Sequence, residues 1–279
     1  MDLLDRLIDL ALAEDVGPGD LTTEALVPAD QVAKASFLCK ERLVVAGLEA
    51  ARRTFLRLDP RCQVHFFVEE GRVVEPGRVF GEVEGPVRAI LTAERTALNF
   101  LQRLCGIATL TRAWVDALAG ERMRLLDTRK TVPGHRILEK EAVRAGGAMN
   151  HRYGLYDGVL IKDNHLAAVG SIEEAIARAR ARAPSLTKIE IEVTTPEEAE
   201  RAAAAGADVI LLDNMSDEAI AEAVRRVGGR ALTEVSGGVT LERLPRLART
   251  GADFVSAGAI THQARAVDIS LELEQRRAS

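Results

Sequence analysis

Positive charge gathers in the stretch LLDTRKTVPGHR, residues 125–136, directly after a short apolar run. Arg129 and Lys130 stand side by side in this stretch. Residues 150–152 read Asn-His-Arg, and another apolar run, GVLI, is followed directly by Lys162. Ammonium groups bind carboxylates and phosphates as point charges, and guanidinium groups bind them through paired hydrogen bonds. These residues therefore indicate a site for anionic ligands.

Carboxylates and small residues end four later apolar runs in the same manner. Two of these runs lead to Glu192 and to Asp213, and two lead to the tripeptides Ser236-Gly237-Gly238 and Ser256-Ala257-Gly258. Two carboxylates close together suit Mg²⁺, which takes a few oxygen ligands and keeps the rest of its shell for water or substrate phosphates. Small-residue loops that enter helices bind phosphate through backbone N–H groups.

The elements that must position these residues alternate regularly in the second half of the chain. Short apolar runs alternate with segments such as SIEEAIARARARA and TPEEAERAAAAG, which begin with Ser or Thr and carry Glu in the first turn. That composition is typical of capped helices between parallel strands. We predict an incomplete parallel (β/α) barrel, in which the carboxyl ends of the strands share one rim and form the active site. An open doubly wound sheet is the alternative, although no GxGxxG motif follows a strand.

The first half has a different pattern and predicts an α/β sandwich domain. A helix at the N-terminus, a loop GPGDLTTE, strands, a helix LEAARRTFLRL and a strand meander precede a long helix over 88–120. The Glu-Glu-Gly and Glu-Pro-Gly turns favour antiparallel pairing within the meander. We place an N-terminal domain at 1–105 and the barrel at 106–265, with a C-terminal helix over 266–279 as a candidate to pack on the first domain.

Composition excludes several classes of protein. The 279 residues carry a formal net charge of -5, which argues against a general binder of nucleic acid or of anionic membranes. No apolar run approaches the roughly 20 residues of a membrane helix. The acids in MDLLDRLIDLALAED do not fit a secretory signal. Cys39, Cys62 and Cys105 form no CxxC pair, which predicts reduced thiols in a cytoplasmic protein.

Seven motifs together resemble one enzyme family over nearly the whole chain. They are ERTALNFLQRLCGIAT, LLDTRKTVPGHR, AVRAGGAMNHRYGLYDGVLIKDNH, EIEV, LLDN, SGGV and SAGAITH. In this order they resemble quinolinate phosphoribosyltransferase, also called nicotinate-nucleotide pyrophosphorylase (carboxylating). The resemblance implies transfer of phosphoribosyl from phosphoribosyl pyrophosphate to quinolinate with decarboxylation, which yields nicotinate mononucleotide, pyrophosphate and CO₂ for NAD biosynthesis. It also implies a homodimer with shared active sites, or a hexamer.

The resemblance also implies roles for residues of this chain. The expected catalytic residues are Lys130, Lys162, Glu192 and Asp213. The expected quinolinate ligands are Arg95 from the neighbouring subunit, Arg129, His151, Arg152 and Lys162. Phosphoribosyl pyrophosphate is expected at Thr128, Lys130, Glu192, Asp213, Ser236, Gly237, Gly238, Ser256, Ala257 and Gly258. Mg²⁺ is expected at Glu192 and Asp213.

Other interpretations of the same residues stay open at the level of sequence. Lys162 at a strand end also suits the Schiff base of an aldolase-like lyase. Relatives encoded with molybdate transport genes look similar over the barrel without making this nucleotide. Arg95 could be an ordinary surface arginine beside Asn99. Glu190 lies one layer below Glu192 on the same face of its strand, where we expect it to pair with a buried cation.

Overall fold

The computed structural model describes residues 2–274 and divides the chain into two compact units. Unit 1 comprises the chain up to residue 112, residues 132–147 and the segment from 263 onward, and unit 2 comprises 113–131 and 148–262. The expected boundary near residue 105 falls inside helix α4 (Val87–Ala117), which confirms the long helix predicted over 88–120. Residues 132–147, which the sequence assigned to the barrel, belong to unit 1.

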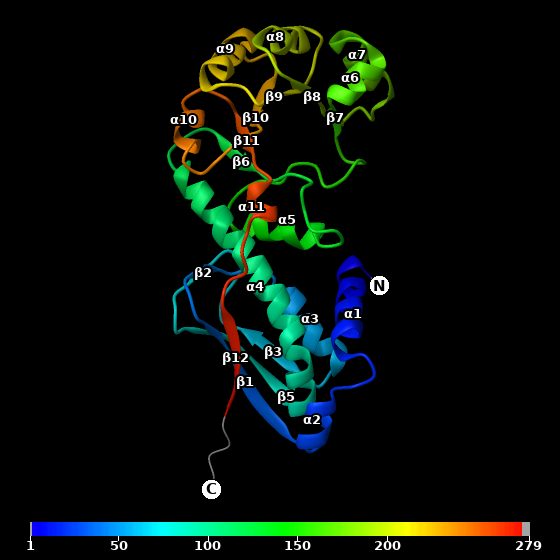
Figure 1. The fold of residues 1–279 in the computed structure, drawn as a ribbon, viewed down its shortest axis with the longest axis vertical. Helices are drawn as coiled ribbons and strands as arrows, with labels where there is room; N and C mark the ends of the chain where they lie inside the picture. The colour runs from blue at the N-terminus through cyan, green and yellow to red at the C-terminus, as the bar shows by residue number, and fades with distance from the viewer. Residues whose placement is uncertain (1, 275–279) are drawn as a thin grey trace. The chain divides into compact units, whose positions relative to one another are not determined.

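Unit 2 is built on a parallel sheet whose strands are those predicted from the apolar runs (Figure 1). The strands are β6 (Arg124–Leu126), β7 (Val159–Ile161), β8 (Ile189–Val193), β9 (Val209–Asp213), β10 (Leu232–Ser236) and β11 (Phe254–Ser256). Their order is β6-β11-β10-β9-β8-β7, so the first strand of the sheet pairs with the last. That cyclic order belongs to a barrel left open between β6 and β7, and it excludes a doubly wound sheet, whose strand order reverses midway.

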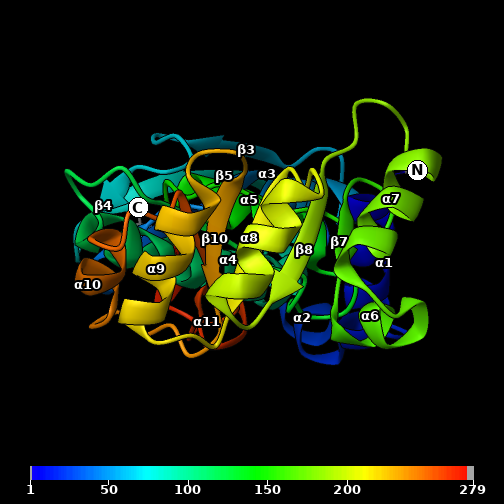
Figure 2. The same cartoon turned by 90° about the horizontal axis from the view of Figure 1, so that it is seen from above.

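Helices cover the outer face of this sheet. The helices between consecutive strands are α7 (Ile172–Arg182), α8 (Pro196–Ala204) and α9 (Asp217–Val227), and they lie side by side in Figure 2. Each starts at a hydroxyl cap: Ser171, Thr195 and Ser216 accept a backbone N–H from three residues further on, at 3.2 Å. Such a cap stabilises a helix by about 1 kcal/mol. Two short helices, α10 (Leu244–Ala248) and α11 (Ala259–His262), flank β11 in the chain, and the unpredicted α6 (Asp163–Val169) begins directly after Lys162.

Unit 1 contains an antiparallel sheet with the order β12-β1-β5-β3. Its strands are β1 (Val32–Cys39), β3 (Gln63–Phe66), β5 (Val79–Pro86) and β12 (Ile269–Leu273). The predicted meander is wrong in one respect, because β4 (Val73–Val74) leaves this sheet and pairs with β2 (Leu43–Val44). Strand β3 consequently pairs with β5 directly.

The helix predicted over 266–279 is wrong across its described part. Residues 269–273 form β12, which pairs antiparallel with Ala35–Cys39 of β1. The segment ISLEL alternates apolar and polar residues, and this period of two belongs to a strand. The last residues, 275–279, lie outside the described part of the chain. Two further helices, α2 (Leu21–Leu26) and α5 (Arg136–Ala145), occupy stretches for which the sequence predicted no helix.

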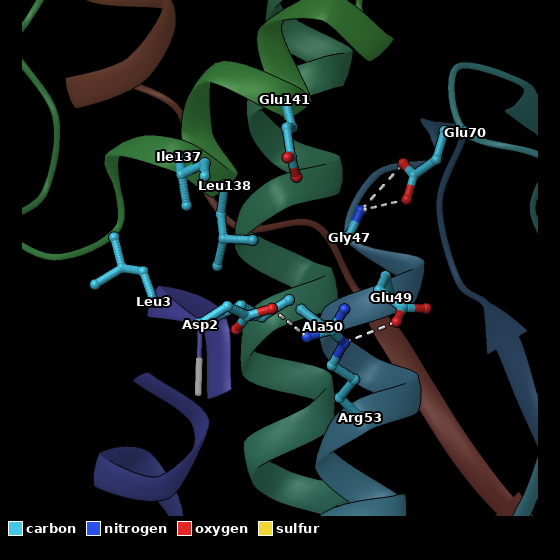
Figure 3. Close-up of a pocket in the computed structure, with 11 residues that line it drawn as sticks. Asp2, Leu3, Gly47, Glu49, Ala50, Arg53, Glu70, Ile137, Leu138 and Glu141 are labelled. Carbon is cyan, nitrogen blue, oxygen red and sulfur yellow. Dashed lines mark hydrogen bonds and ion pairs between the residues drawn. The ribbon is translucent and has the colours of Figure 1, made fainter. Parts of the chain in front are cut away.

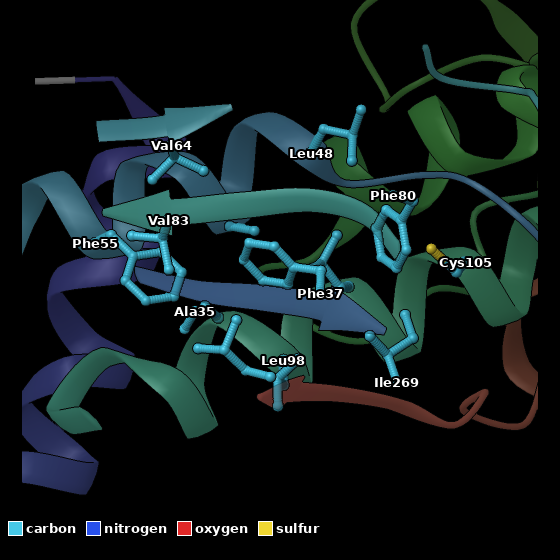
Figure 4. Packing of buried hydrophobic residues seen from close by; sticks show 14 of the residues in the cluster. Ala35, Phe37, Leu48, Phe55, Val64, Phe80, Val83, Leu98, Cys105 and Ile269 are labelled. Atoms are coloured by element: carbon cyan, nitrogen blue, oxygen red, sulfur yellow. The ribbon is translucent and has the colours of Figure 1, made fainter. Parts of the chain in front are cut away.

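The core of unit 1 lies between this sheet and two helices, α3 (Leu48–Leu58) and α4, while α1 (Leu3–Val16) contacts α3 (Figure 4). Phe37 from β1 stands edge-on to Phe55 from α3, with ring centroids 6.0 Å apart. Both side chains are fully buried, and truncation of either to alanine would cost about 3–5 kcal/mol. This arrangement is the predicted α/β sandwich. Within residues 2–274, no helix combines the length and the apolar composition that a membrane crossing requires.

Candidate active site

A cleft of about 670 Å³ opens in unit 2 at the carboxyl ends of the parallel strands. Twelve sequence-predicted residues line it, namely Thr128, Arg129, Lys130, His151, Arg152, Lys162, Glu192, Asp213, Ser236, Gly237, Gly238 and Ser256. Ala257 and Gly258 follow Ser256 directly, and a Cβ on Gly258 would lie 2.7 Å from the Lys130 side chain. Arg95 lies elsewhere, on an exposed face of α4 within unit 1.

The cationic segments of the cleft are held together by a buried carboxylate. Asp127, at the end of β6, is fully buried and accepts hydrogen bonds from the Asn150 amide at 2.7 Å and the His151 backbone N–H at 2.8 Å. The backbone of Lys130 is held on both sides, by the hydroxyls of Thr128 and Thr261. These two hydrogen bonds hold the segment after β6 next to residues 150–152, so the two cationic segments predicted from the sequence lie together in the cleft.

Arg152 and Lys162 extend the positive charge across the cleft. The Arg152 guanidinium donates to the Gly158 carbonyl at 2.9 Å, and its pKa is lowered by burial and then by the nearby charge of Arg129. Lys162 stands at the first turn of α6, where the Nδ1 atom of His165 accepts its backbone N–H at 2.9 Å. An arginine whose pKa is lowered by burial and by a neighbouring cation marks a site where a bound anion would be stabilising.

Glu192 and Asp213 provide the carboxylates of the rim. Glu192 accepts a hydrogen bond from the Lys162 ammonium at 2.9 Å, and Asp213 accepts one from the Asn214 amide at 2.7 Å. In the part of the chain that the structure describes, each of these contacts uses one oxygen of the carboxylate. The second oxygens make a donor set of the kind that Mg²⁺ takes beside substrate phosphates, so the residues fit the expected ion.

The loop after β10 has a backbone that favours glycine. Gly237 and Gly238 have φ values of +81° and +59°, and a Cβ on Gly237 would lie 2.3 Å from the Asn214 amide oxygen. Asn214 itself has a φ of +53°, and its N–H donates to the Ser236 carbonyl at 3.0 Å. The ends of β9 and β10 are therefore held together, and the glycine backbone after β10 can approach a ligand closely.

The floor of the cleft consists of His151, Glu190 and Glu234. The Nε2 atom of His151 lies 2.9 Å from a Glu190 oxygen and 3.6 Å from a Glu234 oxygen. Burial first, and then the charge of Glu190, raise the pKa of Glu234 to about 8. Glu190, for which we expect a buried cation as partner, lies next to the imidazole of His151.

Sequence reasoning missed several lining residues that a simple rule finds. Leu160, Leu211 and Glu234 line the cleft, and each precedes a predicted rim residue by two positions. Alternate residues of a strand point to the same face, so the rim residues indicate the layer beneath them. Asn214, the last residue of the LLDN motif, has no role in the sequence analysis, and in the structure its amide donates to Asp213.

A second cavity, of about 310 Å³, lies within unit 1 among α1, α3 and α5 (Figure 3). Arg53 there contacts Asp2 at 2.6 Å and Glu49 at 2.8 Å. The Glu70 carboxylate accepts the backbone N–H groups of Gly47 and Leu48 at the start of α3. Arg53 is the one cation among the described residues that line this cavity, beside four carboxylates, so the cavity lacks the cation cluster of the cleft.

Comparison with known proteins finds one family along the chain. The family models "Quinolinate phosphoribosyl transferase, C-terminal domain" and "N-terminal domain" match residues 107–272 and 20–105. A probable nicotinate-nucleotide pyrophosphorylase [carboxylating] of Bacillus subtilis is 43% identical, over 97% of this chain and 93% of its own length. Quinolinate phosphoribosyltransferase [decarboxylating] 1b of Nicotiana tabacum is 39% identical, over 99% of this chain and 83% of its own.

Solved structures agree with the sequence comparisons. The crystal structure of NadC from Streptococcus pyogenes superposes with a TM-score of 0.94 at 43% identity, and the match covers 97% of this chain and 96% of that one. The cation cluster, the paired carboxylates and the glycine loop thus stand in a fold shared from end to end with these proteins. The chain belongs to the quinolinate phosphoribosyltransferase family.

Proposed function

We propose that this chain transfers the phosphoribosyl group of phosphoribosyl pyrophosphate to quinolinate with decarboxylation. The products are nicotinate mononucleotide, pyrophosphate and CO₂, and the reaction belongs to NAD biosynthesis. One observation carries the proposal beyond family membership: Arg129, Arg152 and Lys162 line one cleft together with Glu192 and Asp213. A dicarboxylate and a pyrophosphate ester are the ligands that such a set would recognise.

The cation cluster favours quinolinate over nicotinate as the acceptor. Quinolinate carries two carboxylates on adjacent ring carbons, and nicotinate carries one. Arg129, Arg152 and Lys162, with His151 beside them, exceed what one carboxylate would pair. A ligand with one carboxylate would compensate less of this positive charge than a dicarboxylate, and such mismatches discriminate between substrates by orders of magnitude.

Phosphoribosyl pyrophosphate is proposed to bind along the opposite part of the rim. Lys130 and Thr128 would face the pyrophosphate, and Ser236 with Gly237 and Gly238 would hold phosphate through backbone N–H groups. Ser256, Ala257 and Gly258 form a second small-residue turn for the same purpose. Mg²⁺ held by Glu192 and Asp213 would compensate the negative charge of the leaving pyrophosphate.

The proposed chemistry needs placement and charge compensation rather than a covalent nucleophile. The quinolinate nitrogen attacks C1 of the ribose as the bond from C1 to pyrophosphate breaks, and positive charge builds on the sugar. The pyridinium so formed accepts the electron pair released when the C2 carboxylate leaves as CO₂. A proton then replaces that carboxylate at C2.

The test is nucleotide formation by the purified protein from quinolinate. We expect product only with both phosphoribosyl pyrophosphate and Mg²⁺, one CO₂ released per nucleotide, and little or no turnover of nicotinate. Nucleotide formation without CO₂, or equal use of nicotinate, would contradict the proposal.

A lyase that uses Lys162 in a Schiff base is the rival activity. The Lys162 ammonium forms an ion pair with Glu192 at 2.9 Å, whereas a Schiff base requires a neutral amine. Borohydride treatment with a carbonyl substrate is therefore expected to leave no covalent adduct. An adduct on Lys162 would favour the lyase.

We further propose a homodimer, or a hexamer, in which Arg95 of one subunit completes the site of its neighbour. Arg95 is exposed on α4 and does not line the cleft of its own chain. Mixing inactive Arg95→Ala chains with inactive Lys162→Ala chains should restore part of the activity, since one site of the mixed dimer regains both residues. Verified mixed dimers without recovery would show that Arg95 is a surface residue.

The cysteines are consistent with the cytoplasmic location predicted from the sequence. Cys39, Cys62 and Cys105 are free and buried. Burial raises the pKa of the Cys62 thiol to about 11 and that of Cys105 to about 12, so neither thiol is reactive at neutral pH. We propose that the protein works in a reducing compartment.

A further inference from the structure

Two buried carboxyl groups beneath the cations have no part in the proposed reaction. Glu234 and Glu190 have side chains exposed by only 2% and 9%, and both face the His151 ring. One oxygen of each carboxyl and a nitrogen of His151 lie within 4.8 Å of one another. Such a cluster in the floor of a binding cleft is costly to bury unless it serves the site.

The hydrogen bonds of His151 determine where its proton lies. The Nδ1 atom accepts the backbone N–H of Arg152 at 2.7 Å, so Nδ1 carries no proton. The proton of the ring is therefore on Nε2, which points at Glu190 from 2.9 Å. The ring thereby connects the buried carboxyl groups to the backbone of Arg152, the proposed quinolinate ligand.

The two carboxyl groups lack a donor for one oxygen each. In the described part of the chain, Oε1 of Glu190 and Oε1 of Glu234 are buried and have no hydrogen-bond partner. Two ionised carboxylates this close in a buried site repel each other and lose their hydration. A proton on Glu234 removes one charge and turns one acceptor into a donor toward Glu190, which stabilises both groups.

The surroundings of Glu234 favour its neutral form. The polar groups that face it are Glu190 from β8, His151 from the loop before β7 and Ser256 from β11, and its register partner on β9 is Leu211. Burial and Glu190 raise the pKa of Glu234, while His151 and the Ser256 hydroxyl oppose this effect, and the result is about 8. Glu234 therefore keeps its proton at neutral pH.

We propose that Glu234 is a positioning residue that acts as a neutral carboxylic acid, holding Glu190 and His151 so that Arg152 stays aligned for the substrate carboxylate. This inference rests on the proposed function, because Arg152 is the proposed quinolinate ligand. Ionisation of Glu234 would place a second negative charge beneath the anion site and weaken quinolinate binding. Phosphoribosyl pyrophosphate, which is proposed to bind to other residues, should be much less affected.

The test compares the pH profiles of the wild type, Glu234→Gln and Glu234→Ala. In the wild type, KM for quinolinate should stay level below pH 8 and rise about tenfold for each unit above it, as the competent neutral fraction falls. Glu234→Gln keeps a neutral donor of the same size, so it should rescue binding at pH 7 and lack the alkaline rise. Glu234→Ala should raise KM for quinolinate at every pH, with smaller changes in kcat and in KM for phosphoribosyl pyrophosphate.

A matched control is available in unit 1. Glu139 is fully buried there, pairs with Arg103, and has one oxygen without a hydrogen-bond partner among the described residues. Glu139→Gln should lower Tm without removing the alkaline rise, because it lies outside the cleft. Loss of the rise in this control would mean that a general stability effect, rather than Glu234, produces the profile.

Four results would overturn the inference. Glu234→Gln could be as impaired as Glu234→Ala at pH 7, or it could keep the alkaline rise. A metal retained by the wild type in equal amount to the chain, and lost in Glu234→Gln, would show that the cluster is a metal site. An infrared carboxylic-acid band at pH 7 that vanishes in Glu234→Gln supports the inference without any turnover assay, and its absence from the wild type overturns it. A wild type that makes no nucleotide contradicts the proposed function instead.

Discussion

Two hollows of this molecule, the cavity of unit 1 and the cleft of unit 2, both contain arginines and carboxylates, yet the pKa of an arginine is shifted in opposite directions in the two. In the cavity of unit 1, contacts with Glu49, Asp2 and Asp5 raise the pKa of Arg53 above its ordinary value. In the cleft of unit 2, burial and the charge of Arg129 lower the pKa of Arg152. The surroundings of Arg53 stabilise its charged form, and the surroundings of Arg152 destabilise its charged form.

This difference separates a structural ion-pair network from a binding site. Arg53 already has the carboxylates that it needs, so a ligand would gain nothing by displacing them. Arg152 has a backbone carbonyl as hydrogen-bond partner and a like charge nearby, so an arriving carboxylate relieves an existing cost. The direction of the shift therefore tells more about function than the number of charges in a hollow.

Arg152→Ala should give the largest effect. Loss of a charged hydrogen bond costs about 1–3 kcal/mol, which corresponds to a KM for quinolinate raised by roughly fivefold to more than a hundredfold. Arg152→Lys keeps the charge without the paired donors, so its KM for quinolinate should lie between those of the wild type and Arg152→Ala. Steady-state kinetics with varied quinolinate measure these KM values. An unchanged KM in Arg152→Ala would show that the lowered pKa of Arg152 does not mark a binding residue.

Asp213→Asn should give a somewhat smaller loss, directed at the other substrate. The change removes the charge that we assign to Mg²⁺ and leaves the amide contact of Asn214 within reach. We expect KM for phosphoribosyl pyrophosphate to rise roughly tenfold, with a higher Mg²⁺ requirement, which corresponds to the lower end of the about 1.5–3 kcal/mol that a charged contact contributes. Glu192→Gln should act similarly, but it also removes the partner of Lys162. If both variants kept the Mg²⁺ dependence of the wild type, the metal assignment would be incorrect.

Gly237→Ala and Gly238→Ala should differ although they are neighbours. Both have a left-handed φ, which costs roughly 1–2 kcal/mol for another residue. A Cβ on Gly237 would lie 2.3 Å from the Asn214 amide oxygen, whereas a Cβ on Gly238 would have the Arg243 guanidinium no nearer than 4.0 Å. Gly237→Ala should therefore displace Asn214 and weaken phosphoribosyl pyrophosphate binding more than Gly238→Ala does. Equal KM values in the two variants would show that the contact with Asn214 is unimportant.

Arg53→Ala should give the smallest effect, confined to stability. Its ion pairs lie near the surface, where such pairs contribute about 0–1 kcal/mol each. We expect a fall in Tm of a few degrees at most and unchanged kinetics for both substrates. Salt should reduce the difference in Tm, since it screens exposed charges. A large kinetic effect would place unit 1 closer to the chemistry than its paired charges suggest.

Much of this molecule follows from local sequence, and the reason is physical. Strands β6 to β11 were predicted because an apolar run between capped helices has few other stable arrangements. Lys162, Glu192 and Asp213 were placed on one rim because parallel strands of a barrel end at the same face. Glu234 could have been predicted too, by counting back two residues from Ser236.

Tertiary structure decided what depends on partners far away in the sequence. Residues 269–273 become strand β12 because β1, more than two hundred residues earlier, offers them hydrogen-bond partners. The sequence alone does not reveal where the protons of Glu234 and His151 lie. Their positions depend on Glu190 and on the backbone of Arg152, which folding brings into contact with them. Local periodicity determines which face of an element is apolar and where the element ends. Burial, desolvation and the partner of each polar atom are set only when distant segments pack together.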